Sequence, residues 1–191
     1  GCVAYTQRFF ADGSISAKAL AGAGAASILL GGVRTDSSNG TQITANASTV
    51  AVVSDVNVGK ELIFVAKDAM TVADGVTIRT SATGPEKARS MTVVGEGAAL
   101  VVSNQANTDL RRDLSNVSGT STKTLNLGQG VTLAGASVQL DSSGQVVRQQ
   151  ALTLDTSALG IGTNSIAAPS AVFRAMTTLQ PSIRRIGVVY S

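Results

Sequence analysis

The chain has 191 residues and a hydrophobic content of 43%, which is enough to bury one sizeable core without disulfides. Charged residues make up only 14% and aromatic residues 3%, so we expect a surface of Ser, Thr, Asn and Gln around a core of small and β-branched side chains. Histidine is absent and the one cysteine is Cys2, which excludes Ser-His-Asp and Cys-His catalytic arrangements and zinc sites of the usual types.

The net charge is +3, but the basic residues do not form a nucleic-acid-binding pattern. The longest basic runs are the pairs Arg111-Arg112 and Arg184-Arg185, and no aromatic residues alternate with them, so no nucleic-acid partner is predicted. The longest apolar runs, 28–30 and 62–66, are far shorter than the ~20 residues that span a bilayer, so no membrane insertion is predicted. The start at Gly1-Cys2 indicates a processed product or an internal piece, and Cys2 is interpreted as an incidental thiol.

Residues 1–26 are predicted to be an irregular lead-in, and residues 27–166 a series of short strands. The strand segments are enriched in β-branched residues and alternate apolar with polar positions. They are Ser27–Leu30, Thr41–Ala47, Thr49–Val53, Glu61–Ala66, Met70–Val72, Val76–Ile78, Met91–Val94, Ala99–Val102, Lys123–Leu127, Val131–Leu133, Ser137–Leu140 and Ala151–Leu154. Turn triplets at 73–75, 95–97, 128–130 and 142–144 separate them.

The spacing of the apolar pairs favours a β-solenoid. The pairs in 125–127, 131–133 and 138–140 follow each other more closely than the strands of hairpin-built sandwiches, which recur about every 8–12 residues. Residues 70–78 also align without gaps on residues 125–133, an internal echo that we interpret as spanning more than one coil. The predicted fold class is therefore all-β, a parallel β-helix in one continuous segment, 1–191, of a larger protein.

Three segments are predicted to depart from the coils. Residues 81–89 and 104–122 are polar and are expected to project from the rod as loops. Residues 167–180 are predicted to form a short helix, with Pro169 in its first turn and Pro181 beyond its end. A last strand is expected within 182–191.

The acidic residues offer few candidates for chemistry. Asp109 and Asp113 flank Arg111 and Arg112, and a β-helical polysaccharide hydrolase or lyase would need such carboxylates, but we interpret them as a solvated loop with local ion pairs. Calcium ligation by Glu61, Asp68 and Asp74 is not predicted, because no Gly-Gly-x-Gly-x-Asp repeat accompanies them. No catalytic, cofactor-binding or metal-binding residue is assigned.

Two other groups of motifs are interpreted as structural. The glycines of 22–24 and 31–32 lack the continuation of a phosphate-binding loop and are expected in turns and close packing. Asn39, Asn46 and Asn116 fit the glycosylation sequon, and we interpret them as corner residues of the coils.

The order of segments resembles the filamentous-haemagglutinin family of large exoproteins. The resemblance extends from about Ala25 to Tyr190 and depends most on the turns at Ser27–Gly32 and Gly95–Leu100. The segments that carry it are Ala25–Arg34, Ile43–Ala45, Glu61–Ala66, Met70–Ile78, Val94–Ser103, Leu125–Ala134 and Leu154–Ile166. The chain lacks the amino-terminal secretion module of that family and an Arg-Gly-Asp tripeptide.

The resemblance implies a right-handed parallel β-helix in a secreted, cell-surface adhesin with roles in adhesion, aggregation or biofilm. The implied partners are an outer-membrane transporter of the two-partner secretion type, host glycans or proteins, and further copies of the filament. No catalysis and no cofactor are expected. A carbohydrate-active β-helix enzyme and a phage tail-fibre-like β-rod remain alternatives, which polysaccharide assays and the mass in solution would separate.

Overall fold

The computed structural model describes residues 2–5, 27–38, 40–59, 61–80, 89–104, 108–119, 121–148, 152–155 and 188–190. Every regular element in these ranges is a β-strand, so the all-β prediction is confirmed for the part of the chain that the structure describes. The helix predicted at 167–180 lies outside the described residues. The expected irregular lead-in contains a strand, β1 (Cys2–Tyr5), which pairs with β2 (Ser27–Leu30).

The strands form four sheets, here named A to D. Sheet A has the order β1, β2, β7 (Glu61–Ala66), β11 (Ala98–Ser103), β15 (Ser137–Ser142). Sheet B has the order β12 (Thr108–Asp113), β10 (Arg89–Val94), β4 (Gly40–Ala45), β3 (Gly32–Ser37). Sheet C has the order β18 (Val188–Tyr190), β16 (Gln145–Arg148), β13 (Thr124–Leu127), β8 (Ala69–Val72), β5 (Thr49–Val52). Sheet D has the order β17 (Thr153–Asp155), β14 (Thr132–Ala134), β9 (Thr77–Thr80), β6 (Val56–Val58).

Sheets C and D are entirely parallel, and their strands stack in register. In sheet C the buried residues of successive strands form the row Val50, Met70, Leu125, Val146. In sheet D the corresponding row is Val56, Ile78, Leu133 and the partly buried Leu154. Each row places apolar side chains of the same kind above one another, which is how a narrow β interior is filled without large aromatic residues.

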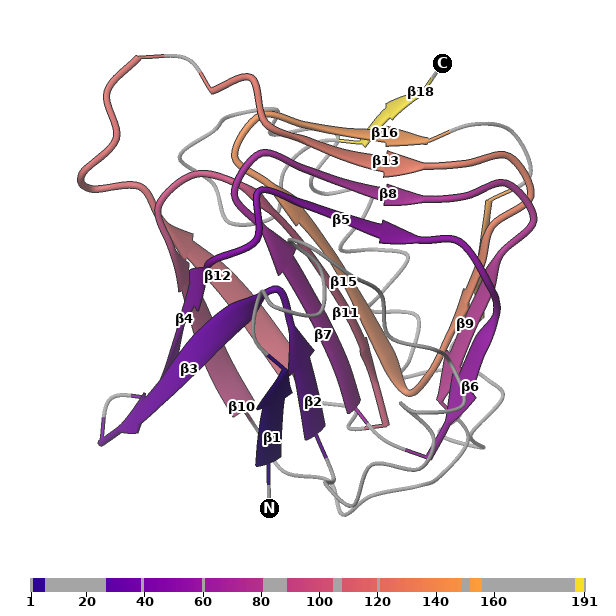
Figure 1. Cartoon of the computed structure of the whole chain (residues 1–191), viewed down its shortest axis with the longest axis horizontal. Helices are drawn as coiled ribbons and strands as arrows, with labels where there is room; N and C mark the ends of the chain where they lie inside the picture. The colour runs from indigo at the N-terminus through magenta and orange to yellow at the C-terminus, as the bar shows by residue number, and fades with distance from the viewer. Residues whose placement is uncertain are drawn as a thin grey trace.

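Sheets A, C and D surround the main hydrophobic core on three sides (Figure 1). In that view sheet C runs across the top, sheet D lies at the right, and β7, β11 and β15 cross diagonally between them. Among the described residues, 24 buried apolar side chains form this core, and Phe64 is the largest of them. From β5 to β15 the chain visits sheet C, then sheet D, then sheet A three times, with β10 of sheet B inserted before β11, so each circuit adds one layer to this core.

A second core lies between sheet A and sheet B. Leu29, Ile63, Val65 and Val101 of sheet A contact Ile43 and other residues of sheet B there. Because sheet A carries the main core on its other face, all six residues of β7 and of β11 are buried. Sheet B is therefore an added layer on one side of the three-sided core.

Sheets A and B each contain parallel and antiparallel pairs, so the prediction of a uniformly parallel β-helix is wrong for these two sheets. After β9 the chain enters sheet B as β10, returns through sheet A as β11, and enters sheet B again as β12. This excursion reverses the direction of β11, which is antiparallel to both β7 and β15. The hairpin of β3 and β4 is also antiparallel.

The loop predicted at 104–122 contains the strand β12, which pairs in parallel with β10 over six residues. Leu110 and Arg112 alternate with exposed Arg111, and both are buried. The segment looked like a loop because one of its inward-facing positions is an arginine instead of an apolar residue. The other predicted projection, 81–89, lies outside the described residues apart from Arg89, which begins β10.

Candidate functional site

The two acidic residues that the sequence offered for catalysis lie four residues apart on one strand. Asp109 and Asp113 both lie on β12, opposite Ser90 and Val94 of β10. Four residues of extended chain put their backbones about 13 Å apart. The backbone N–H of Ser115 donates to Asp113 and lowers the pKa of that carboxyl, which opposes a role as general acid.

The three acidic residues considered for calcium lie in different environments. Asp68 accepts a bond from the Nζ of Lys123 at 2.8 Å, and this bond raises the pKa of Lys123. Asp74 accepts from a backbone N–H, and Glu61 is buried between two serines. Within the described ranges, no group of three or more His, Cys, Asp or Glu side chains could hold a metal ion.

Sequence reasoning missed a buried polar row at the amino end of β7. Glu61 is 1% exposed, and its two carboxylate oxygens accept bonds of 2.7 Å from the hydroxyls of Ser27 and Ser103. Arg34 donates to the same Ser27 hydroxyl at 3.4 Å. The row joins β2, β7 and β11 where their side chains face sheet B. Its serines are separated from Glu61 by 34 and 42 residues, so no local sequence pattern predicts the row.

A second buried polar contact holds β12 against β15. Arg112 donates from Nε to Asp141 at 2.7 Å, and its Nη2 lies 2.6 Å from the same carboxylate oxygen. Its Nη1 donates to the carbonyl of Gly95 at 2.8 Å. Both side chains are almost fully buried, so this ion pair fastens the edge of sheet B to the edge of sheet A.

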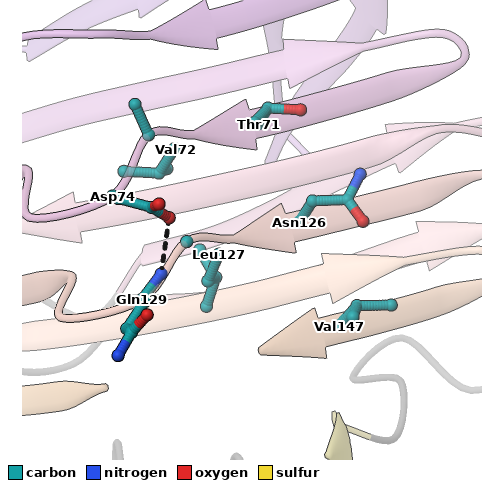
Figure 2. Close-up of a pocket in the computed structure, with 9 residues that line it drawn as sticks. Thr71, Val72, Asp74, Asn126, Leu127, Gln129 and Val147 are labelled. Atoms are coloured by element: carbon teal, nitrogen blue, oxygen red, sulfur yellow. Dashed lines mark hydrogen bonds between the residues drawn. The ribbon is translucent and has the colours of Figure 1, made fainter. Parts of the chain in front are cut away.

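An open pocket lies on the outer face of sheet C, beside the turns that follow β8 and β13 (Figure 2). Its volume is about 370 Å³, within the range of small-ligand sites. Thr71, Asn126 and Val147 occupy matching positions on β8, β13 and β16 and form its strand side. Asp74 and Gln129 project from the two turns. We call this site the sheet C groove.

The two turns beside the sheet C groove are fixed to each other by hydrogen bonds. The backbone N–H of Gln129 donates to Oδ1 of Asp74 at 2.8 Å, and the N–H of Gly75 donates to the carbonyl of Gln129 at 2.8 Å. A Cβ at Gly128 would lie 2.6 Å from the backbone nitrogen of Asp74, so a glycine is needed for the turns to stack this closely. The polar groups at this end of the groove are therefore held in place before any ligand arrives.

The glycine motifs and the sequon asparagines can be located where the structure describes them. Gly31 and Gly32 lie at the tight corner between β2 and β3, as predicted. Asn46 donates its backbone N–H to Gly31 at that corner, and Asn116 is exposed in a turn. Asn39, the glycines of 22–24 and the pair Arg184-Arg185 lie outside the described residues.

Comparison with protein-family models, with curated proteins and with solved structures gives no match to this chain. In the described part of the chain, no helix is long and apolar enough to cross a membrane.

Proposed function

We propose that the chain is a structural and adhesive segment of a large secreted bacterial surface filament, and that it acts without catalysis. The observation that supports this most is the in-register, parallel stacking of sheets C and D. Stacking of this kind lets a rod grow by adding coils, since each new coil buries its apolar row on the one below. A long rod then presents many weak contacts at once and gains avidity from their number.

In this proposal the path is a right-handed parallel β-helix interrupted by sheet B, first by the β3–β4 hairpin and then by the excursion through β10 and β12. Contacts between neighbouring coils recur about one circuit apart, as in the bond from the N–H of Thr77 to Asp55, which spans 22 residues. Across the excursion the separation is 55 residues, as for Gln129 and Asp74. Sheet B would then thicken one side of the rod while the stacking in sheets C and D continues past it.

The resemblance to filamentous-haemagglutinin exoproteins supplies the biological part of the proposal. It assigns the filament to the outer surface of the cell, reached through an outer-membrane transporter of the two-partner secretion type. Host glycans, host proteins or neighbouring filaments are the partners on that surface. The exterior of sheet C fits this role, because its described outward positions include the polar residues Thr71 and Asn126 beside short apolar ones such as Ala51 and Val147.

The test is to raise antiserum against the purified chain and apply it to intact cells of the source bacterium. We expect labelling without permeabilisation, and a strain lacking the gene should lose both the label and a measurable part of its attachment or aggregation. Antiserum against a cytoplasmic protein is the control for cell integrity. Labelling that appears only after permeabilisation would contradict the proposal.

Two measurements on the purified chain address the other classes of protein. Depolymerisation of acidic or neutral polysaccharides that is lost in Asp113→Ala would make it an enzyme. A trimeric mass in solution would favour an intertwined fibre of the phage type, whereas a single-chain coil predicts a monomer.

A further inference from the structure

The sheet C groove has hydrogen-bonding capacity that the described protein does not use. The hydroxyl of Thr71 and the side-chain amide of Gln129 have no partner among the described residues. Asn126 uses its Nδ2 to donate to Thr124 at 3.0 Å, which leaves its carbonyl oxygen for another group. Asp74 uses Oδ1 for the backbone of Gln129 and keeps Oδ2. Figure 2 shows these side chains around one open space.

The charge of the sheet C groove selects against anions and metal ions. Asp74 carries the one formal charge among its described lining residues, and it is negative, so phosphates, sulfates and acidic sugars would be repelled. A calcium ion needs six or more oxygen ligands, and one carboxylate with two amides and a hydroxyl falls short of that number. Neutral ligands and organic cations remain.

The polar groups call for a ligand that both donates and accepts hydrogen bonds. The free oxygens of Asp74 and Asn126 accept, the amide of Gln129 can donate, and the hydroxyl of Thr71 can do either. Sugar hydroxyl groups match this mixture, since each can donate and accept. Val147 extends the row of Thr71 and Asn126 with an apolar side chain, which suits the C–H face of a sugar ring. Adjacent strands about 4.8 Å apart set the spacing of this row.

We propose that the sheet C groove binds one neutral sugar unit of a glycan, with Asp74 and Asn126 accepting from its hydroxyl groups. The inference rests on the proposed adhesive function and names the ligand class at one site of it. Because no aromatic ring lines the described groove, each site binds weakly and a useful avidity comes from repetition along the filament.

The test is a titration of the full 191-residue chain with neutral monosaccharides and their oligomers, followed by backbone amide NMR. Glucose, galactose, mannose and N-acetylglucosamine are the neutral probes, and glucuronic acid is the acidic one. We expect at least one neutral sugar to shift the amides of residues 71–75 and 126–130, and glucuronic acid to leave them unchanged. Absence of any shift with all neutral probes, or an equal shift with glucuronic acid, would overturn the proposal.

Variants connect the binding to the side chains. Asn126→Ala and Thr71→Val should each weaken the binding of the active sugar about threefold to tenfold, the effect of one lost hydrogen bond. Gln129→Ala serves as a second probe because its side chain is exposed and makes no contact that the fold needs. Asn57→Ala is the matched control, since Asn57 is exposed on β6 of sheet D and lies away from the groove.

Unchanged affinity in all three groove variants, with folded spectra, would refute the assignment. The result is independent of the cell experiment: surface labelling without sugar binding would reject only the groove, and sugar binding without surface labelling would reject only the filament.

Discussion

Gly31 makes the corner between β2 and β3 possible through both its backbone conformation and its lack of a side chain. Its φ is +90°, and a Cβ at this position would collide with the backbone carbonyl of Val65. We expect Gly31→Ala to lower the free energy of unfolding by at least about 3 kcal/mol, because the strain of a left-handed residue adds to the displacement of a central strand. Urea denaturation of both proteins measures the difference.

Gly75 provides the matched control for conformation alone. Its φ is +71°, but a Cβ there would meet nothing within 4 Å. Gly75→Ala should therefore cost only about 1 kcal/mol, the price of the left-handed backbone. Equal losses in the two variants would show that the close approach to Val65 does not matter.

Arg112 tests whether the excursion is fastened by its buried ion pair. Arg112→Met keeps much of the side-chain volume but leaves the buried carboxylate of Asp141 without its guanidinium, so we expect a loss of about 3–5 kcal/mol in the free energy of unfolding. Arg111→Met makes the same chemical change at the next, exposed position of β12 and should cost less than about 1 kcal/mol. Thermal unfolding of the two variants side by side distinguishes them, and a similar small effect in both would mean that the ion pair is not needed.

At the scale of the strands, the internal echo turns out to be a pair of neighbours. Met70 of β8 pairs directly with Leu125 of β13, and Ile78 of β9 pairs with Leu133 of β14. The interpretation that the echo spans more than one coil was therefore wrong. The separation of 55 residues is long because β10, β11 and β12 lie between the two segments in the sequence. In space the two segments are direct neighbours.

Leu125 tests this equivalence. Leu125→Met gives β13 the same residue that β8 has at the paired position, and as a volume-conserving change it should cost less than about 1.5 kcal/mol. Leu125→Ala leaves a cavity in the fully buried row and should cost about 2–5 kcal/mol. Denaturant midpoints at constant slope give both values. A large loss of unfolding free energy in Leu125→Met would show that β8 and β13 are packed differently.

What could be predicted from the sequence follows the local chemistry of each element. The turn triplets 73–75 and 128–130 hold glycines with positive φ at Gly75 and Gly130, and most of the predicted strands have counterparts in the structure. The reversed direction of β11 could not be predicted, because its continuous apolar run is compatible with either direction. The sheet C groove is also invisible in the sequence, since Thr71 and Asn126 meet only through the pairing of β8 with β13.

On the scale of the whole molecule, the two faces of sheet A are buried against different partners. The inner face of sheet A closes the three-sided core, and its outer face packs on sheet B. Its last strand, β15, departs from this pattern: Gln139 and Asp141 face sheet B, whereas Val138 and Leu140 belong to the main core. The apolar part of the second core thus ends at β15, where buried Gln139 and the Arg112–Asp141 ion pair continue the contact between sheets A and B.

This layering predicts how hydrogen exchange is distributed. β7 and β11 are flanked by strands on both sides and buried on both faces, so their amides can exchange only when the whole structure opens. β3 lies at the end of sheet B and is largely exposed, so its amides should exchange through local opening at a much lower free energy.

Hydrogen exchange followed by mass spectrometry or NMR measures this order. We expect the protection of Glu61–Ala66 and Ala98–Ser103 to equal the global free energy of unfolding. Arg112→Met should lower both together, because the ion pair fastens sheet B, which covers these strands, to sheet A, which contains them. If β7 and β11 instead kept their full protection in that variant, sheet B would be a separately unfolding layer, and sheets A, C and D alone would account for the stability of the main core.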